Sequence, residues 1–141
     1  MFPLRVHIAS PNDAIELRTR VRTACVVLGY SSGDLTLLMT VVSELARNIL
    51  QHAGEGDITI VEVATDGRVG LEIAATDHGP GIPDVDLAMR TGYSSSGGPG
   101  LGLAAIRRGV DDLIIESANG NGTTVRATKW LRSPSRRRNG D

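Results

Sequence analysis

The sequence is poor in cysteine, histidine and lysine, and each shortage excludes a kind of structure or site. A single cysteine, Cys25, excludes an internal disulfide and fits a reducing cytoplasm. One cysteine and three histidines leave no zinc constellation. The only lysine, Lys129, follows no glycine-rich loop, so a Walker P-loop is excluded. Any nucleotide must therefore be held in another way.

Long apolar runs and an excess of charge are missing too. No stretch approaches the roughly 18 apolar residues of a membrane helix. The first ten residues, MFPLRVHIAS, lack the apolar core of a signal peptide and are more typical of a strand. Basic residues number 15 and acidic residues 16, so the net charge of −1 favours neither nucleic acid nor an anionic membrane as a partner.

The length of 141 residues suits one domain, for which we expect the boundaries 1–131. Residues 132–141 (RSPSRRRNGD) contain no apolar side chain and carry a net charge of +3, so we expect a basic, disordered tail. Glycine is abundant, since it accounts for 17 of the 141 residues, well above its usual share of about 7 %.

The spacing of apolar residues predicts the order strand, helix, helix, strand, strand, loop, helix, strand, strand. The first strand covers 4–8, and the first helix begins at Ser10-Pro11 and ends near Gly29. A longer helix restarts at 31–34 and ends at Gly54. The buried positions expected on the first helix are Ile15, Val21, Cys25 and Leu28, and those on the second are Leu35, Leu38, Met39, Val42, Ala46 and Ile49.

Two hairpins complete the pattern. Residues 58–64 and 69–75 flank Asp66-Gly67, and 113–117 and 123–131 flank the Asn-Gly repeats at 119–122. Between the hairpins, 77–100 is irregular with a short helical piece near 86–90, and 101–110 is expected to be a helix. This order predicts an α+β two-layer sandwich, with helices on one face of one sheet.

The second helix carries Glu44, Asn48 and His52 on successive turns of one side. These residues are either an ordinary polar edge, with a hydrogen bond between Glu44 and Asn48, or part of a site. In a site, Asn48 would offer a neutral oxygen to Mg²⁺. Glu44 would then face a terminal phosphate and accept the proton of a hydroxyl nucleophile.

The segment Asp77-His78-Gly79-Pro80-Gly81 follows a strand directly. A half-buried Asp77 needs a partner, which is either an adenine amine or its own loop through an Asx turn. Gly79 and Gly81 permit a flat ring to approach the backbone closely. Thr123 either supports the same base through a water or is an ordinary strand residue.

The serine–glycine run at 94–103 (SSSGGPGLGL) leads into a helix. Its free backbone amides and the helix N-terminus favour phosphate, whereas a flexible linker would not explain why glycines continue into the helix. Residues 100–105 loosely match a dinucleotide fingerprint, but they do not follow an apolar strand.

Four segments together resemble the GHKL ATPase superfamily: ELARN (44–48), DHGPG (77–81), GGPGLGL (97–103) and GTT (122–124). The resemblance covers about 3–131 and is strongest to the small serine/threonine kinases of bacterial sigma-factor regulation, the RsbT type. It implies the Bergerat fold, ATP and Mg²⁺ as cofactors, a lid at about 83–98, Glu44 as the catalytic carboxylate and Asn48 as the Mg²⁺ ligand. The nucleotide-binding residues it implies are Asn48, Asp77, Gly79, Gly81, Ser96, Gly97, Gly98, Gly100, Leu101, Gly102 and Thr123.

The resemblance also implies a reaction and its partners. Kinases of this type phosphorylate a serine or threonine of a STAS-domain antagonist protein in the cytoplasm, and a PP2C-type phosphatase or a sigma factor is a further candidate partner. Nucleic acid and membranes are not expected partners. Two alternatives use the same pocket: an anti-sigma factor that sequesters a sigma factor, and an ATP-binding adaptor without turnover.

Overall fold

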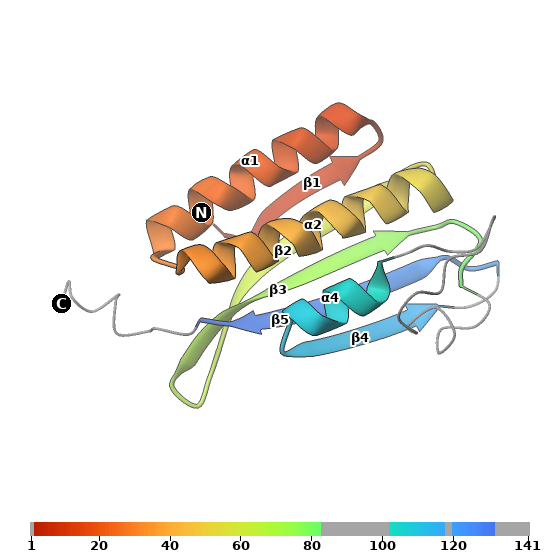
Figure 1. The fold of residues 1–141 in the computed structure, drawn as a ribbon. Coiled ribbons are helices and arrows are strands. Elements are labelled where there is room, and N and C mark those ends of the chain that lie inside the picture. Colours follow the sequence, from red (N-terminus) through yellow and green to blue (C-terminus); the bar gives the residue numbers. More distant parts are fainter. Residues whose placement is uncertain (1, 83–101, 118–119, 132–141) are drawn as a thin grey trace.

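The computed structural model describes residues 2–82, 102–117 and 120–131, and these form two layers (Figure 1). The elements are β1 (Leu4–Ile8), α1 (Pro11–Leu28), α2 (Ser32–His52), β2 (Gly56–Thr65), β3 (Arg68–Asp77), α4 (Leu103–Gly109), β4 (Asp112–Ser117) and β5 (Thr123–Trp130). The strands form one antiparallel sheet in the order β1-β2-β3-β5-β4. Figure 1 shows α1, α2 and α4 on the same face of this sheet. The predicted order of elements and the α+β sandwich are confirmed.

Helix α1 begins where its capping residues predict. The Ser10 hydroxyl accepts a hydrogen bond from the Asp13 amide at 3.3 Å, and the Asp13 carboxylate accepts one from the Ala9 amide at 2.8 Å. Each side chain therefore satisfies a backbone donor that the helix start would leave unpaired. Gly29, with a φ of 84°, ends the helix in the left-handed conformation that glycine adopts without strain.

The buried face of α1 differs from the prediction at one end. Leu17, Val21 and Cys25 are buried, but Ile15 is 59 % exposed. Two residues turn a helix by about 200°, so Ile15 points away from the face that carries Leu17. The expectation that Ile15 lies in the core is therefore wrong.

Helix α2 is the central helix and contacts α1, α4 and the strands β1, β2 and β3. It starts at the predicted cap, since the Ser31 hydroxyl accepts the Asp34 amide at 3.1 Å. Its end is also as predicted, because the Gly54 amide donates to the Ile49 carbonyl at 2.8 Å with a φ of 87°. The buried apolar positions of α2 are Leu38, Met39, Val41, Val42, Leu45, Ala46 and Ile49, whereas Leu35, also expected in the core, is only partly buried.

The hairpin between β2 and β3 has the two-residue turn that its sequence predicts. Asp66 and Gly67 both have positive φ, 48° and 77°, and join the paired residues Thr65 and Arg68. Both strands are longer than predicted, and β3 extends to Asp77. This extension places Asp77 within the sheet, between Gly56 of β2 and Thr123 of β5.

A buried ion pair joins the sheet to the start of α2. Lys129 of β5 lies 3.8 Å from the Asp34 carboxylate and 4.0 Å from that of Asp111, which precedes β4. The Lys129 and Asp34 side chains are 4 % and 2 % exposed. Asp111 also accepts the Trp130 amide at 2.7 Å. The only lysine of the chain therefore joins α2 to β5 and to the turn between α4 and β4.

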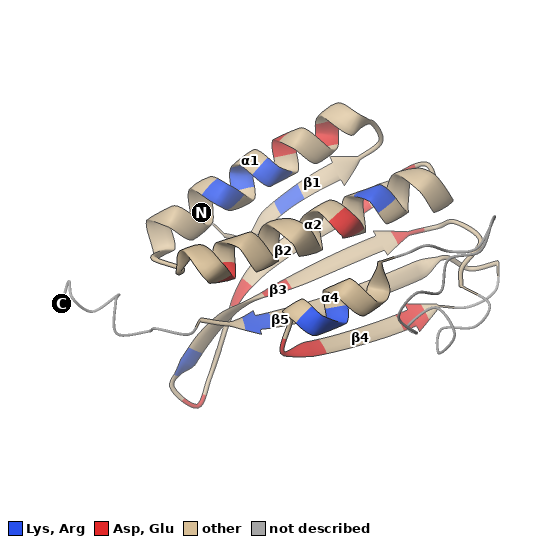
Figure 2. Ribbon diagram, in the orientation of Figure 1, with Lys and Arg blue, Asp and Glu red and all other residues tan. Residues whose placement is uncertain are grey.

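Several sequence-based expectations fall on residues that the structure does not describe: the helical piece near 86–90, the lid at 83–98 and the tail at 132–141. Within the described ranges, none of the helices combines the length and the apolar character that a membrane crossing requires. Figure 2 shows acidic and basic residues interspersed over the helices and strands, with a basic pair on α4.

Candidate functional site

The carboxyl-terminal half of α2 carries the polar side of the candidate site. The Glu44 carboxylate accepts a hydrogen bond from Arg47, at 2.5 Å, and is 26 % exposed. Arg47 also donates to Gln51 at 3.2 Å, so Glu44 is held by a short polar chain along the helix. One turn after Glu44, the Asn48 side-chain oxygen is buried. One further turn along, the His52 Nε2 atom is buried and has no hydrogen-bond partner among the described residues.

Gly102 places the start of α4 directly against Glu44. It has a φ of 66° and is the residue before the first turn of α4. A Cβ at this position would overlap the Glu44 carboxylate. The positive φ favours glycine at this position, and the contact joins two of the four predicted motifs across 58 residues of sequence. The other predicted residues of the glycine-rich loop, Ser96, Gly97, Gly98, Gly100 and Leu101, lie outside the described residues.

Asp77 occupies the last position of β3 and is half-buried. Its Oδ1 atom accepts the Gly79 amide at 2.9 Å, so the Asx-turn interpretation is correct for this oxygen. The second carboxylate oxygen accepts no hydrogen bond from the described part of the chain, and Asp77 lines a pocket. One oxygen thus orders the loop while the other remains available to a ligand.

The glycines after Asp77 bring this loop close to α2. A Cβ on Gly79 would lie 2.7 Å from the Ala53 Cβ and 3.0 Å from the His52 carbonyl oxygen. Gly81 has a φ of 84°. Gly79 is therefore needed for packing against the end of α2. The sequence-based interpretation, in which Gly79 lets a flat ring approach the backbone, does not include this packing role.

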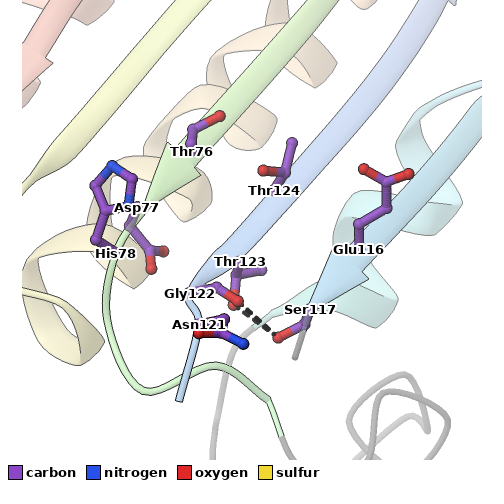
Figure 3. Close-up of a pocket in the computed structure, with 9 residues that line it drawn as sticks. All are labelled: Thr76, Asp77, His78, Glu116, Ser117, Asn121, Gly122, Thr123 and Thr124. Carbon is purple, nitrogen blue, oxygen red and sulfur yellow. Dashed lines mark hydrogen bonds between the residues drawn. The ribbon is translucent and has the colours of Figure 1, made fainter. Parts of the chain in front are cut away.

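A pocket of about 460 Å³ opens where β3 and β4 end and β5 begins (Figure 3). It is lined by Thr76, Asp77, His78, Glu116, Ser117, Asn121, Gly122, Thr123 and Thr124. Asp77 and Thr123 are register partners and share a face of the sheet with the buried Ala75 and Val125. The two predicted base-recognition residues therefore lie side by side on the face that the helices cover.

Ser117, at the end of β4, belongs to this site but was not predicted. Its hydroxyl accepts the Ile82 amide at 2.7 Å, donates to the Gly122 carbonyl at 3.1 Å and lies 3.0 Å from the Thr123 hydroxyl. The Gly120 amide donates to the Pro80 carbonyl at 2.6 Å. These bonds fasten the loop after β3 to the turn before β5. No local sequence signal marks Ser117, since the Ile82 contact spans 35 residues.

Gly122, the second glycine of the turn before β5, also brings this turn against the loop after β3, through its backbone. Its φ is 85°, and an added Cβ would overlap the Asp77 carbonyl. It directly precedes Thr123, so the left-handed turn sets where β5 begins. The GTT segment at 122–124 is thus adjacent to the loop after Asp77, as its place among the four motifs predicts.

The donor set fits a purine nucleotide with a hydrated divalent cation. The second oxygen of Asp77 and the hydroxyl of Thr123 line the pocket and can meet a base. Among the described residues, no group of three or more His, Cys, Asp or Glu could hold a metal ion. Asn48 would therefore supply a single protein oxygen, which suits Mg²⁺ because that ion keeps waters and phosphates as its other ligands.

Comparisons with known proteins identify the family of the chain. The family described as histidine kinase-, DNA gyrase B-, and HSP90-like ATPase matches residues 33–133. The chain is 43 % identical over 127 residues to the serine/threonine-protein kinase RsbT of Bacillus subtilis, covering 90 % of this chain and 96 % of RsbT. It is 30 % identical to the anti-sigma F factor of Caldanaerobacter subterraneus, covering 93 % and 94 % of the two chains.

A structural relative supports the fold. The crystal structure of the RsbU and RsbW domains of Rv1364c from Mycobacterium tuberculosis matches with a TM-score of 0.57 at 22 % identity. The match covers 92 % of this chain and 33 % of that one. The predicted GHKL resemblance and Bergerat fold are thereby confirmed. The chain belongs to the histidine kinase-, DNA gyrase B- and HSP90-like ATPase family, and within it to the group of serine/threonine-protein kinases that contains RsbT.

Proposed function

We propose that this protein is an ATP- and Mg²⁺-dependent serine/threonine kinase that phosphorylates a STAS-domain antagonist protein in a partner-switching pathway of sigma-factor regulation. The observation that carries the proposal is the contact between Glu44 on α2 and Gly102 at the start of α4. It places a carboxylate beside the end of the glycine-rich loop, where a terminal phosphate would lie. The 43 % identity to RsbT supports a kinase over other members of the family.

In this proposal each motif has a separate task. Glu44, held by Arg47, orients the acceptor hydroxyl and takes its proton. Asn48 holds Mg²⁺, which when bound offsets the negative charge of the phosphates. Asp77 accepts the adenine amine, with Gly79, Gly81 and Thr123 around the base. The loop residues Ser96, Gly97, Gly98, Gly100, Leu101 and Gly102 offer backbone amides to the phosphates.

The organisation of the chain forms part of the proposal. The kinase domain would span 1–131, with a lid at about 83–98 and a basic tail at 132–141. The protein would act in the cytoplasm together with its antagonist partner, and a PP2C-type phosphatase or a sigma factor would be a further partner.

The test is transfer of labelled phosphate from ATP to purified STAS-domain proteins. Glu44→Gln should bind ATP as the wild type does but transfer phosphate about 10²–10⁴-fold more slowly, since it lacks the base. Glu62→Gln, an exposed change on β2, is the matched control and should transfer at the wild-type rate. Wild-type transfer by the Glu44 variant would exclude this role.

Sequestration of a sigma factor is the second candidate function, favoured by the similarity to anti-sigma F factors. It predicts that an immobilised chain with ATP retains a purified sigma factor. An adaptor without turnover, by contrast, would bind ATP and leave every candidate partner unlabelled. The labelling assay and the retention assay, each run with sigma-factor and STAS-domain proteins, together separate these outcomes.

A further inference from the structure

The Ser117 hydroxyl uses its whole hydrogen-bonding capacity at the rim of the pocket. Its three partners are the Ile82 amide at 2.7 Å, the Gly122 carbonyl at 3.1 Å and the Thr123 hydroxyl at 3.0 Å. A serine hydroxyl has one proton to donate and two lone pairs that accept. The three contacts therefore account for the proton and both lone pairs.

The direction of each bond follows from the chemistry of the partner. The Ile82 amide can only donate and the Gly122 carbonyl can only accept. The Ser117 proton therefore goes to the Gly122 carbonyl (Figure 3). The remaining contact requires Thr123 to donate its proton to Ser117, which leaves only lone pairs of the Thr123 hydroxyl for a ligand.

Asp77 presents the same polarity beside Thr123. The two residues are register partners on neighbouring strands, on the face that the helices cover. A carboxylate offers only acceptors, and one of its oxygens already binds the Gly79 amide. This end of the pocket therefore favours binding of a ligand that donates N–H hydrogen bonds to Asp77 and Thr123, either directly or through a shared water. An oxo oxygen in place of an amino group at the position that faces Asp77 and Thr123 would leave acceptors facing one another.

We propose that Ser117 is a positioning residue that sets the base preference of the pocket. By accepting the Thr123 proton, it makes the Asp77–Thr123 end selective for a purine with an amino group at position 6 and against a 6-oxo purine. The inference rests on the proposed function, in which this pocket holds the base of ATP.

The experiment compares the dissociation constants of ATP and ITP, whose purine rings carry an amino and an oxo group at position 6. The wild type should bind ATP at least about tenfold more tightly than ITP, the effect of one mismatched polar pair. Ser117→Ala frees the Thr123 proton to turn into the pocket, so the preference for ATP should fall several-fold. Ser117→Thr retains the hydroxyl and should restore the preference.

Thr128→Val is the matched control, because Thr128 lies on β5 on the opposite face and outside the pocket. It should leave the ratio of the two constants unchanged. A purely structural role for Ser117 would weaken ATP and ITP equally in Ser117→Ala, and an unchanged ratio overturns the inference.

Two further measurements keep the test decisive. If circular dichroism shows that Ser117→Ala is unfolded, Thr123→Val replaces it, because it removes the same lone pairs with little change of shape. That variant should also lose the preference for ATP, and a wild-type ratio would overturn the inference. A wild-type protein that binds neither nucleotide would instead overturn the proposed function itself.

Discussion

At the scale of single residues, Gly102 and Glu44 show how a backbone conformation fixes the position of a carboxylate. Gly102→Ala would force a side chain into a φ of 66°, at a cost of about 1–2 kcal/mol, and would displace Glu44. We expect the rate of phosphate transfer to fall about 10²-fold, because small misplacements of catalytic groups typically slow a reaction by that factor. Gly67→Ala is the control: its φ is 77°, nothing lies within 4 Å of the added carbon, and transfer should persist.

Asp77 gives a prediction about binding alone. Asp77→Asn replaces a charged acceptor by an amide, which should weaken ATP binding about 10- to 100-fold in calorimetry. Asp66→Asn, in the exposed hairpin turn, changes the net charge equally and should bind ATP normally. Equal affinity in the two variants would argue against Asp77 as the base-recognition residue.

Whether a residue of the candidate site can be recognised from the sequence depends on how far away in the chain its contact partners lie. The sequence singles out Glu44, Asp77 and Thr123 because each belongs to a short motif with its own chemistry, and their roles stay predictions. Ser117 could not, since its role depends on Ile82, 35 residues away. The packing of Gly79 on Ala53 escaped prediction for the same reason.

At the scale of elements, helix ends and hairpin turns were predictable and burial at a helix end was not. Ser10, Ser31 and the Asp66-Gly67 turn act through neighbours within four residues, so local sequence determines them. Which side of α1 faces the sheet depends on how that helix packs, and Ile15 was therefore wrongly assigned to the core. The strand ends at 56 and 77 depend on pairing between chain segments that periodicity alone does not define.

The attachment of α2 to β5 can be tested through its buried ion pair. Lys129→Met would leave the Asp34 carboxylate buried without its cation, and should lower the free energy of unfolding by about 3–5 kcal/mol in urea. Adding Asp34→Leu should recover part of that loss, because the uncompensated charge is removed. Wild-type stability of the Lys129 variant would contradict a structural role for the pair.

At the scale of the whole molecule, stability should depend on pH through the edge of the sheet. The His7 ring bonds Asp57 and Glu55, each at 3.0 Å, and His7 and Asp57 are register partners on β1 and β2. The hydrogen bond to Asp57, followed by that to Glu55, raises the pKa of His7 above its ordinary 6.5. The same bond to His7 lowers the pKa of Asp57 below 3.8.

The signs of these shifts define a window of stability. Protonated His7 stabilises the fold below pH 6.5, and this contribution is lost as the pH rises through the raised pKa. Ionised Asp57 contributes above pH 3.8, and its contribution is lost as the pH falls through the lowered pKa. Urea unfolding should therefore show a decline on the alkaline side that His7→Asn removes. A His7 ring signal that titrates below 6.5 in NMR would contradict this.

The burial of Lys129 also has a practical consequence for mapping the complexes of this protein. Reagents that acylate primary amines find no exposed lysine on the folded chain, because its single lysine side chain is 4 % accessible. Cross-linking through lysine would consequently miss proteins that dock on the folded domain. Carboxylate- or guanidinium-directed chemistry would reach them, and acylation of Lys129 would instead report molecules that have opened.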